Sequence, residues 1–103
     1  MDTLTNLTEI VRREVQWYAL PGLQSTSYFF ANDENHVYTV IDVPDATRKF
    51  RSRVALIARV VGDKVIIEED QNDRPLWETL VQQGIPRENI ILTYAGESAS
   101  LPT

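Results

Sequence analysis

The sequence predicts a single α+β domain in which two helices pack on one sheet built from two antiparallel hairpins. Its 103 residues suffice for one hydrophobic core. Two segments place apolar residues at helical spacing, and four runs of β-branched and aromatic residues are joined in pairs by polar turns. With a short final strand, the expected order along residues 1–103 is α-β-β-β-β-α-β, and residues 95–103 are expected to form a frayed tail.

The first helix is predicted from a stripe of apolar residues near the start of the chain. Steps of three and four separate Leu4, Leu7, Val11, Val15 and Tyr18. This spacing lines one side of an α-helix. Asp2 or Thr3 can cap its start, and Pro21-Gly22 ends it. Trp17 lies beside the stripe, and we favour a position at the edge of the core over one that faces a partner.

The first hairpin is predicted from two runs, Thr26 to Ala31 and Val37 to Val43. Both are rich in β-branched and aromatic residues, and the polar Asn32-Asp33-Glu34-Asn35 between them is typical of a turn. His36, the single histidine, follows this turn. We expect it to be a solvated side chain, because the sequence offers no second histidine or cysteine to share a metal ion with it.

A basic segment, Arg48 to Arg53, follows a break in the sheet at Pro44-Asp45-Ala46-Thr47. In an extended conformation Lys49, Arg51 and Arg53 share one side, because side chains alternate along a strand. Such a ridge could meet phosphate or an acidic partner. The interpretation that we favour is a solvated loop and strand edge that offsets the acidic excess of the chain.

The second hairpin begins with Val54 to Val61, which is nearly all apolar. This predicts a central strand covered on both faces, or on one face by the domain and on the other by a second subunit. Gly62-Asp63 then supplies a two-residue turn with glycine first, as a type II′ hairpin prefers. The core side of the hairpin is expected to hold Leu56, Ala58, Val60, Val65 and Ile67.

This turn also fixes the register of the hairpin. With Val61 opposite Lys64, Ile57 is expected opposite Glu68. Arg59 then lies diagonal to Glu68 on the same side, within reach of a long side chain. The sequence therefore predicts that Arg59 is the positive neighbour of Glu68.

Four acidic residues lie where this strand ends. We call them the acidic junction: Glu68, Glu69, Asp70 and Asp73. Oxygen ligands suit Mg²⁺ or Ca²⁺, but the glycine-containing spacing of an EF-hand is absent. We therefore favour a structural interpretation, in which Asp73 caps the next helix. Glu69 and Asp70 have no structural role in it, and we expect this pair to contact a protein rather than an ion.

The second helix is expected to begin near Arg74-Pro75, since proline is tolerated in a first turn. Its apolar face holds Leu76, Trp77, Leu80 and Val81. Gly84 matches the position after a helix end, with Ile85 placed for the hydrophobic contact of a Schellman motif. Ile90 to Tyr94 is expected to be the last short strand.

Charge and composition argue against several functions. The 15 acidic and 10 basic side chains give a net charge of -5, which opposes docking on phosphate backbones or anionic lipid. There is no cysteine, so disulfides and thiolate metal sites are ruled out. No signal-peptide pattern and no apolar run of about 18 residues is present, so the cytoplasm is expected. Without clustered glycines or a G-x-S-x-G elbow, we expect no catalytic residue, cofactor or metal site.

A family resemblance is carried by the Val61 to Asp70 hairpin, the helix after it and, most specifically, the run Gly84-Ile85-Pro86-Arg87-Glu88-Asn89-Ile90. In this order the chain resembles the XisI-like proteins, the fdxN-element excision controlling factors found mainly in cyanobacteria. The resemblance extends from about Leu4 to Glu97. Arg51-Ser52-Arg53-Val54 departs from the commoner family version, which indicates a divergent branch.

The resemblance implies a small non-enzymatic protein that acts with an XisH-like nuclease-fold partner in control of DNA excision by a site-specific recombinase. On this hypothesis, the candidate partner contacts are Lys49, Arg51, Arg53, Glu69 and Asp70. Two alternatives stay open. The protein could be a recombination directionality factor that binds DNA directly through Arg48 to Arg53, or it could be a small metal-dependent hydrolase. The apolar Val54 to Val61 strand and the two tryptophans also favour a homodimer.

Overall fold

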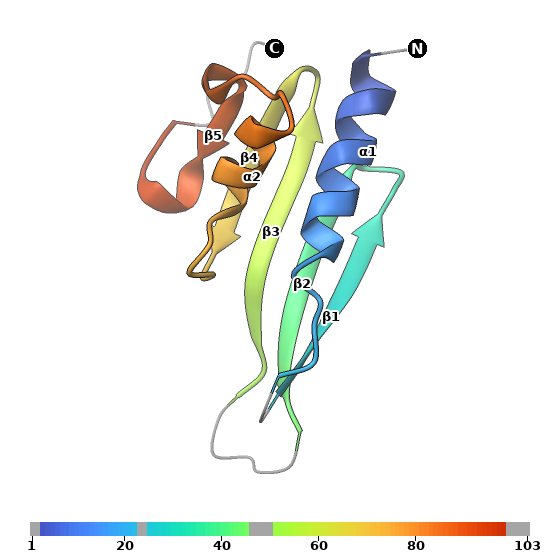
Figure 1. Cartoon of the computed structure of the whole chain (residues 1–103), viewed down its shortest axis with the longest axis vertical. Helices are drawn as coiled ribbons and strands as arrows, with labels where there is room; N and C mark the ends of the chain where they lie inside the picture. The colour runs from blue at the N-terminus through green and yellow to red at the C-terminus, as the bar shows by residue number, and fades with distance from the viewer. Residues whose placement is uncertain (1–2, 23–24, 46–50, 99–103) are drawn as a thin grey trace.

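Two α-helices lie on one face of a five-stranded sheet in the computed structural model, which describes residues 3–22, 25–45 and 51–98 (Figure 1). Its elements are α1 (Thr3–Gln16), β1 (Ser25–Asn32), β2 (Val37–Pro44), β3 (Arg53–Val61), β4 (Lys64–Asp70), α2 (Leu76–Gln82), the 3₁₀-helix η1 (Arg87–Asn89), β5 (Ile90–Leu92) and the 3₁₀-helix η2 (Thr93–Ala95). The strands follow the order β1-β2-β3-β4-β5. Neighbouring strands are antiparallel except β4 and β5, which are parallel. The predicted α+β fold with two hairpins in one sheet is confirmed.

The apolar stripe predicted for α1 is confirmed where its side chains are described, since the buried residues include Leu7, Val11 and Val15. The helix ends at Gln16, before it reaches Tyr18. Pro21 limits how far the helix could continue, because proline has no N–H and disfavours a helical conformation in the residue before it. Asp2, one of the two expected caps, and the side chain of Thr3 lie outside the described part of the chain.

The predicted first hairpin is formed by β1 and β2. Its register pairs Asn32 with Val37. In the turn, the backbone N–H of Asn35 donates to the side-chain oxygen of Asn32 at 3.1 Å, a local contact of the kind that favours asparagine in turns. His36 has a φ of 56°, and its carbonyl accepts the N–H of Val60 in β3 at 3.0 Å. This contact holds the backbone of His36 against β3, and the residue is half-buried rather than fully solvated.

The predicted second hairpin is formed by β3 and β4. Val61 lies opposite Lys64. Gly62 has a φ of 60° while Asp63 is not among the residues of positive φ, as a type II′ turn requires. The expected core side is confirmed, since the structure buries Leu56, Ala58, Val60, Val65 and Ile67.

The predicted pairing of Ile57 with Glu68 is wrong. Ile57 lies opposite Glu69, because the register shifts at this point and leaves Glu68 as an additional residue in β4. This β-bulge reverses the alternation of side chains beyond it. Asp70 lies opposite Leu56 and therefore points to the face that the helices cover. Without the bulge, Asp70 would point to the other face of the sheet.

The end of α2 is the predicted Schellman motif. Gly84 has a φ of 97°, its N–H donates to the carbonyl of Val81 at 3.0 Å, and the N–H of Ile85 donates to the carbonyl of Leu80 at 3.1 Å. The final strand is shorter than expected, because β5 ends at Leu92 and η2 follows. Within the described ranges, no helix is long and apolar enough to cross a membrane.

Candidate functional site

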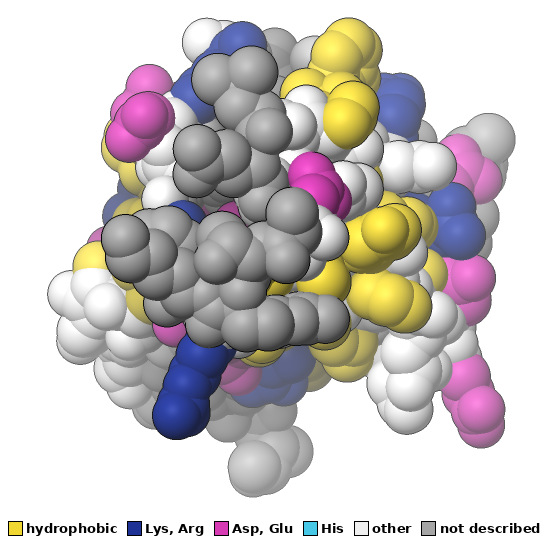
Figure 2. Space-filling model, turned by 90° about the horizontal axis from the view of Figure 1, so that it is seen from below, with side chains coloured by type: hydrophobic (Ala, Val, Ile, Leu, Met, Phe, Trp, Pro, Cys, Tyr) yellow, Lys and Arg dark blue, Asp and Glu magenta, His cyan; other side chains and the backbone are white. Residues whose placement is uncertain are grey.

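The basic segment is described only in part, because Lys49 lies outside the described residues. Arg51 and Arg53 are exposed. The Nε atom of Arg53 lies 3.6 Å from a carboxylate oxygen of Asp42. Figure 2 shows basic, acidic and hydrophobic side chains mixed at this end of the molecule, so the described arginines form no broad basic surface. Partner contact through this segment stays a prediction.

Glu68 in the acidic junction has the positive neighbour that the sequence predicts. The Nε atom of Arg59 donates to its carboxylate at 2.9 Å. The hydroxyl of Thr93, which begins η2, also donates to this carboxylate. The hydrogen bonds from Thr93 and Arg59 lower the pKa of Glu68 below the ordinary value of a glutamate. Glu68 in β4 is therefore bonded to β3 through Arg59 and to η2 through Thr93.

Asp70 is the residue that holds the start of α2, and the predicted cap by Asp73 is wrong. One carboxylate oxygen of Asp70 accepts the N–H of Leu76, the first residue of α2, at 2.8 Å. The other accepts the backbone N–H of Asn72 at 3.0 Å and its side-chain amide at 2.9 Å. The β-bulge makes this contact available, because it turns Asp70 toward the helices.

Glu69 and Asp70 do not form one acidic patch. They are consecutive residues of β4 that lie opposite Ile57 and Leu56, so their side chains point to opposite faces of the sheet. Glu69 is half-buried. In the part of the chain that the structure describes, no three acidic or histidine side chains lie close enough together to hold a metal ion. A role of this pair in partner contact remains a prediction.

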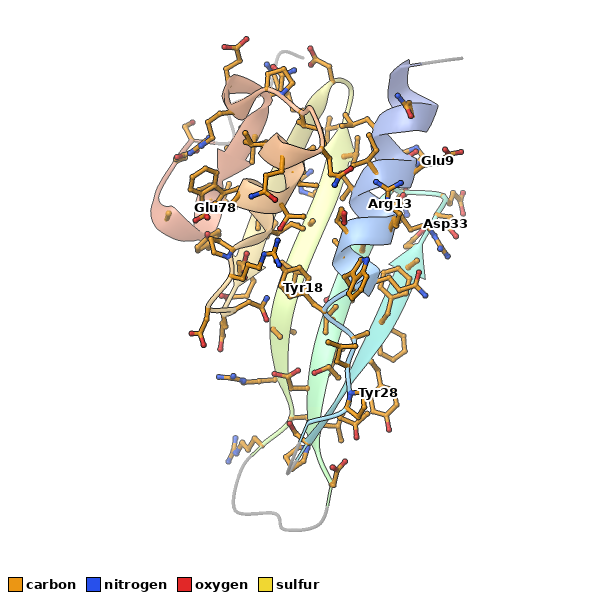
Figure 3. All side chains as sticks on the ribbon, viewed as in Figure 1. Glu9, Arg13, Tyr18, Tyr28, Asp33 and Glu78 are labelled. Atoms are coloured by element: carbon orange, nitrogen blue, oxygen red, sulfur yellow. The ribbon has the colours of Figure 1, made fainter. Side chains whose placement is uncertain are left out.

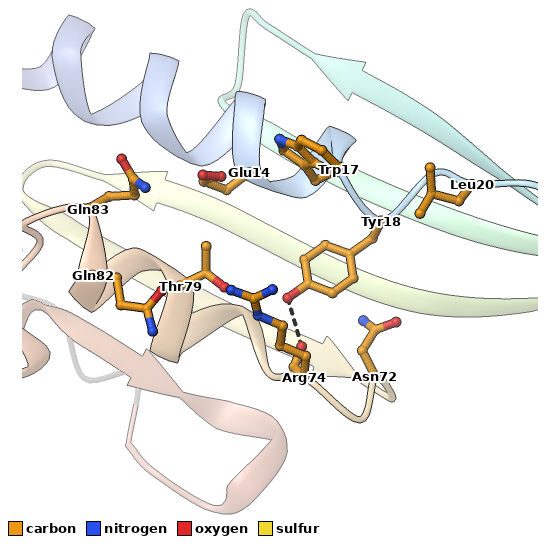
Figure 4. A pocket seen from close by; sticks show the side chains of 9 residues that line it. All are labelled: Glu14, Trp17, Tyr18, Leu20, Asn72, Arg74, Thr79, Gln82 and Gln83. Atoms are coloured by element: carbon orange, nitrogen blue, oxygen red, sulfur yellow. Dashed lines mark hydrogen bonds between the residues drawn. The ribbon is translucent and has the colours of Figure 1, made fainter.

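A cavity of about 620 Å³ opens between α1, the loop after it and α2 (Figure 4). It is lined by Glu14, Trp17, Tyr18, Leu20, Asn72, Arg74, Thr79, Gln82 and Gln83. Trp17 is 68% exposed, so the position that we favour for it at the edge of the core is wrong. The hydroxyl of Tyr18 donates to the carbonyl of Arg74 at 2.7 Å, and burial raises the pKa of this tyrosine. The contact joins the end of α1 to the loop before α2.

Glu14 points into this cavity from the last turn of α1 (Figure 4). The residue is only 7% exposed, and its carboxylate has no hydrogen bond or ion pair with any described residue. The neighbouring Arg13 donates instead to the side-chain oxygen of Gln83 at 3.3 Å. Our sequence interpretation missed Glu14. Its signal is the step of three residues from Val11, which places a carboxylate on the apolar side of the helix.

The run from Gly84 to Ile90 has an architectural role, which depends on Arg87. Its guanidinium lies over the ring of Trp77, 5.2 Å from the centroid, and donates to the carbonyl of Ile90 at 2.7 Å and to Glu97 at 2.6 Å. Glu97 also accepts the N–H of Leu92 at 2.9 Å. The Leu92 N–H and the Arg87 guanidinium lower the pKa of Glu97. The first part of the expected tail is thus tied to the fold.

Comparisons with known proteins agree with this architecture. The sequence matches the family described as XisI protein over residues 1–100, whereas no curated protein matches it. A XisI-like protein from Anabaena variabilis ATCC 29413 has a similar structure, with a TM-score of 0.75 and 24% identity over 86% of this chain and 84% of that chain. For the fdxN element excision controlling factor XisI from the same strain, the TM-score is 0.67 and the identity 21%, over 90% of this chain and 93% of that chain. The family match covers nearly the whole sequence, and this protein therefore belongs to the XisI family.

Proposed function

We propose that this protein is a non-enzymatic accessory factor that controls site-specific excision of a DNA element by binding an XisH-type, nuclease-fold protein. The observation that carries the proposal is the match to the XisI family over residues 1–100. A structure with the same fold is named as the excision controlling factor of the fdxN element. The recombinase would perform the chemistry of excision, and this chain would set whether it occurs.

The carboxylates of Glu68 and Asp70 support a structural rather than a catalytic role for the acidic junction. A catalytic base or metal ligand needs free oxygen atoms that can reach a substrate. In the acidic junction, Glu68 is engaged by Arg59 and Thr93. Both oxygens of Asp70 accept hydrogen bonds from the chain that leads into α2. These groups are used to join elements of the fold.

An excision reporter tests the proposed function. A plasmid carries the DNA element between two primer sites, and the recombinase and the XisH-type protein are expressed with or without this chain. The matched control replaces the codon of Gln16 by a stop codon. We expect the excised junction to accumulate only with the full chain. Equal rates of junction formation with and without it would contradict the proposal.

Direct DNA binding is the second candidate, and the exposure of Arg51 and Arg53 is the observation that favours it. The net charge of -5 opposes it. A gel shift at several salt concentrations, with the element's end sequences as probe, distinguishes the two candidates. Binding that weakens with salt and is lost in the Arg51→Ser, Arg53→Ser variant would support the second candidate. The accessory role predicts no shift by this chain alone.

A further inference from the structure

We infer that the cavity between α1 and α2 binds a positively charged side chain, arginine or lysine, of a protein partner, with Glu14 as its counter-charge. The inference rests on the proposed function only in naming a protein as the source of that side chain. It assigns the ligand's chemistry from the cavity itself.

Glu14 is almost buried and has no partner among the described residues. Glu14 is 7% exposed and its carboxylate makes no hydrogen bond or ion pair with the described residues, so the carboxylate meets solvent only through the opening of the cavity. Removing a charge from water is costly unless an opposite charge or hydrogen-bond donors replace the solvent. An uncharged side chain here would serve the free fold better. A guanidinium or ammonium group that enters the cavity supplies both the charge and the donors.

The size and the lining of the cavity also suit a long cationic side chain. Its volume of about 620 Å³ lies within the ordinary range of ligand pockets. The indole of Trp17 and the ring of Tyr18 line it together with Leu20, and Figure 4 shows the two aromatic side chains on the α1 side of the opening. Aromatic walls suit the apolar stem of arginine or lysine and attract the cation through the ring face. The cavity therefore offers separate surfaces for the stem and for the charge.

Arg74 is the cation among the described residues that line the cavity. Arg74 lines it and is exposed, but it forms no ion pair with Glu14. Its backbone carbonyl is held by Tyr18 at 2.7 Å. Arg74 thus adds a positive charge to the lining, and this charge repels an external cation. Replacing it by alanine should strengthen the binding of an external cation, whereas an anion-binding cavity would lose affinity.

A titration with a defined probe tests the inference. Nα-acetyl-arginine-N-methylamide is added to the ¹⁵N-labelled full chain, and the indole N–H of Trp17 is followed by NMR. The isosteric, uncharged citrulline derivative is the control ligand. Glu14→Gln is the test variant, and Glu9→Gln is the matched control, because Glu9 is exposed on the outer side of the same helix (Figure 3).

We expect saturable binding of the arginine probe in the millimolar range by the natural chain and by Glu9→Gln. Binding should be at least tenfold weaker in Glu14→Gln and stronger in Arg74→Ala. The thermal midpoint should rise in Glu14→Gln and stay constant in Glu9→Gln, which also shows that the test variant folds. Equal affinity for the arginine and citrulline probes, or equal affinity of Glu14→Gln and the natural chain, would overturn the inference.

A co-elution experiment separates this inference from the proposed function. The XisH-type protein is mixed with the natural chain, with Glu14→Gln or with Glu9→Gln, and we expect weaker binding by at least tenfold only for Glu14→Gln. If this partner binds all three chains equally, the cavity is not its docking site and the inference fails while the proposed function stands. If it binds none of them and the arginine probe still requires Glu14, the proposed function fails and the cationic site stands.

Discussion

The carboxylate of Asp70 joins the end of β4 to the start of α2. The first amides of a helix have no acceptor within the helix, and Asp70 supplies one to Leu76 at 2.8 Å. It also orders the intervening loop through Asn72. Pro75, the residue before the helix, makes no side-chain hydrogen bond to it. Asp70 therefore helps to fix the start of α2 against the sheet, together with the burial of Leu76 and Leu80.

Asp70→Ala should lower the free energy of unfolding by about 1 to 2 kcal/mol, because it leaves the amide of Leu76 without this acceptor. Asp73→Ala is the matched control. Asp73 is exposed, so its replacement should change stability by less than about 0.5 kcal/mol. Urea unfolding followed by circular dichroism measures both. A larger loss in Asp73→Ala than in Asp70→Ala would show that the capping residue is assigned wrongly.

Glu68 should make the stability of the protein depend on pH. Its pKa in the folded chain is lowered by Thr93 and Arg59, so the folded chain keeps the carboxylate ionised at pH values where the unfolded chain already binds a proton. The stabilisation is complete above the ordinary glutamate pKa of 4.5. It is lost as pH falls through the lowered folded value.

Thermal unfolding of the natural chain and of Glu68→Gln checks this expectation. The natural chain should have the higher midpoint at pH 7, and the difference should shrink as the pH falls below 4.5, the ordinary glutamate value. Glu69→Gln serves as the control, since the described residues show no hydrogen bond between its carboxylate and Arg59 or Thr93. A difference that grows toward low pH would contradict the lowered pKa.

At the scale of elements, the end of α2 depends on the left-handed backbone of Gly84. Its φ is 97°, and a Cβ atom added there would meet no atom within 4 Å. Gly84→Ala should therefore cost only the backbone strain, about 1 to 2 kcal/mol. Gln82→Ala, at an exposed helical position, should change the free energy of unfolding by less than about 0.5 kcal/mol. Equal stabilities in chemical unfolding would refute this role of Gly84.

The hairpins could be predicted because residues that are neighbours in the sequence determine their turns. Gly62-Asp63 sets a register by itself, and Asn32 begins the other turn with its own side chain. The bulge at Glu68 could not be predicted in this way. It depends on contacts between separate strands, such as the N–H of Gln71 that donates to the carbonyl of Ala55 at 2.9 Å. This one shift decides which aspartate holds α2.

The cavity was beyond prediction for a related reason. Its walls come from the end of α1 and from α2, which are far apart in sequence and meet only in the folded chain. The spacing of the apolar residues predicts the stripe of α1, but it does not predict what the carboxylate of Glu14 faces. Glu14 is a charged residue that lies almost buried on the otherwise apolar side of α1, and the proposed cation site rests on it.

At the scale of the whole molecule, β1 is an edge strand with unpaired backbone groups. The N–H of Ser27 donates to the carbonyl of Leu20 at 3.2 Å, so the backbone groups of Ser27 point away from β2. By the alternation of an antiparallel pair, those of Phe29 and Ala31 do so too. Within the described ranges, the N–H of Ser27 has Leu20 as its partner, whereas the outward groups of Phe29 and Ala31 have no backbone partner. Such an edge can pair with another strand.

A second copy of the chain fits this edge. An antiparallel pair centred on Phe30 would bring Phe29 of each copy opposite Ala31 of the other and satisfy their free groups. Phe30 is 54% exposed and Tyr28 is 49% exposed, and Figure 3 shows Tyr28 where no helix covers β1. Paired aromatic side chains on neighbouring strands would add to the contact. We therefore propose a homodimer through β1.

Sedimentation equilibrium of the natural chain and of Ala31→Pro tests the homodimer. Proline removes the outward N–H of Ala31 and leaves the hydrogen bonds between β1 and β2 intact, as edge strands allow. We expect a dimer at micromolar concentrations for the natural chain and for the control Ala31→Ser, and a monomer for Ala31→Pro. A monomeric natural chain would refute the β1 interface.

Co-expression of the full chain with the XisH-type protein, followed by size-exclusion chromatography and native mass spectrometry of each peak, tests most directly whether this protein acts through a protein partner. The partner itself could not be predicted from the fold, because the same fold serves different partners. We predict one peak at micromolar concentration whose mass contains both chains. Two separate peaks that contain only the individual chains would contradict the accessory role.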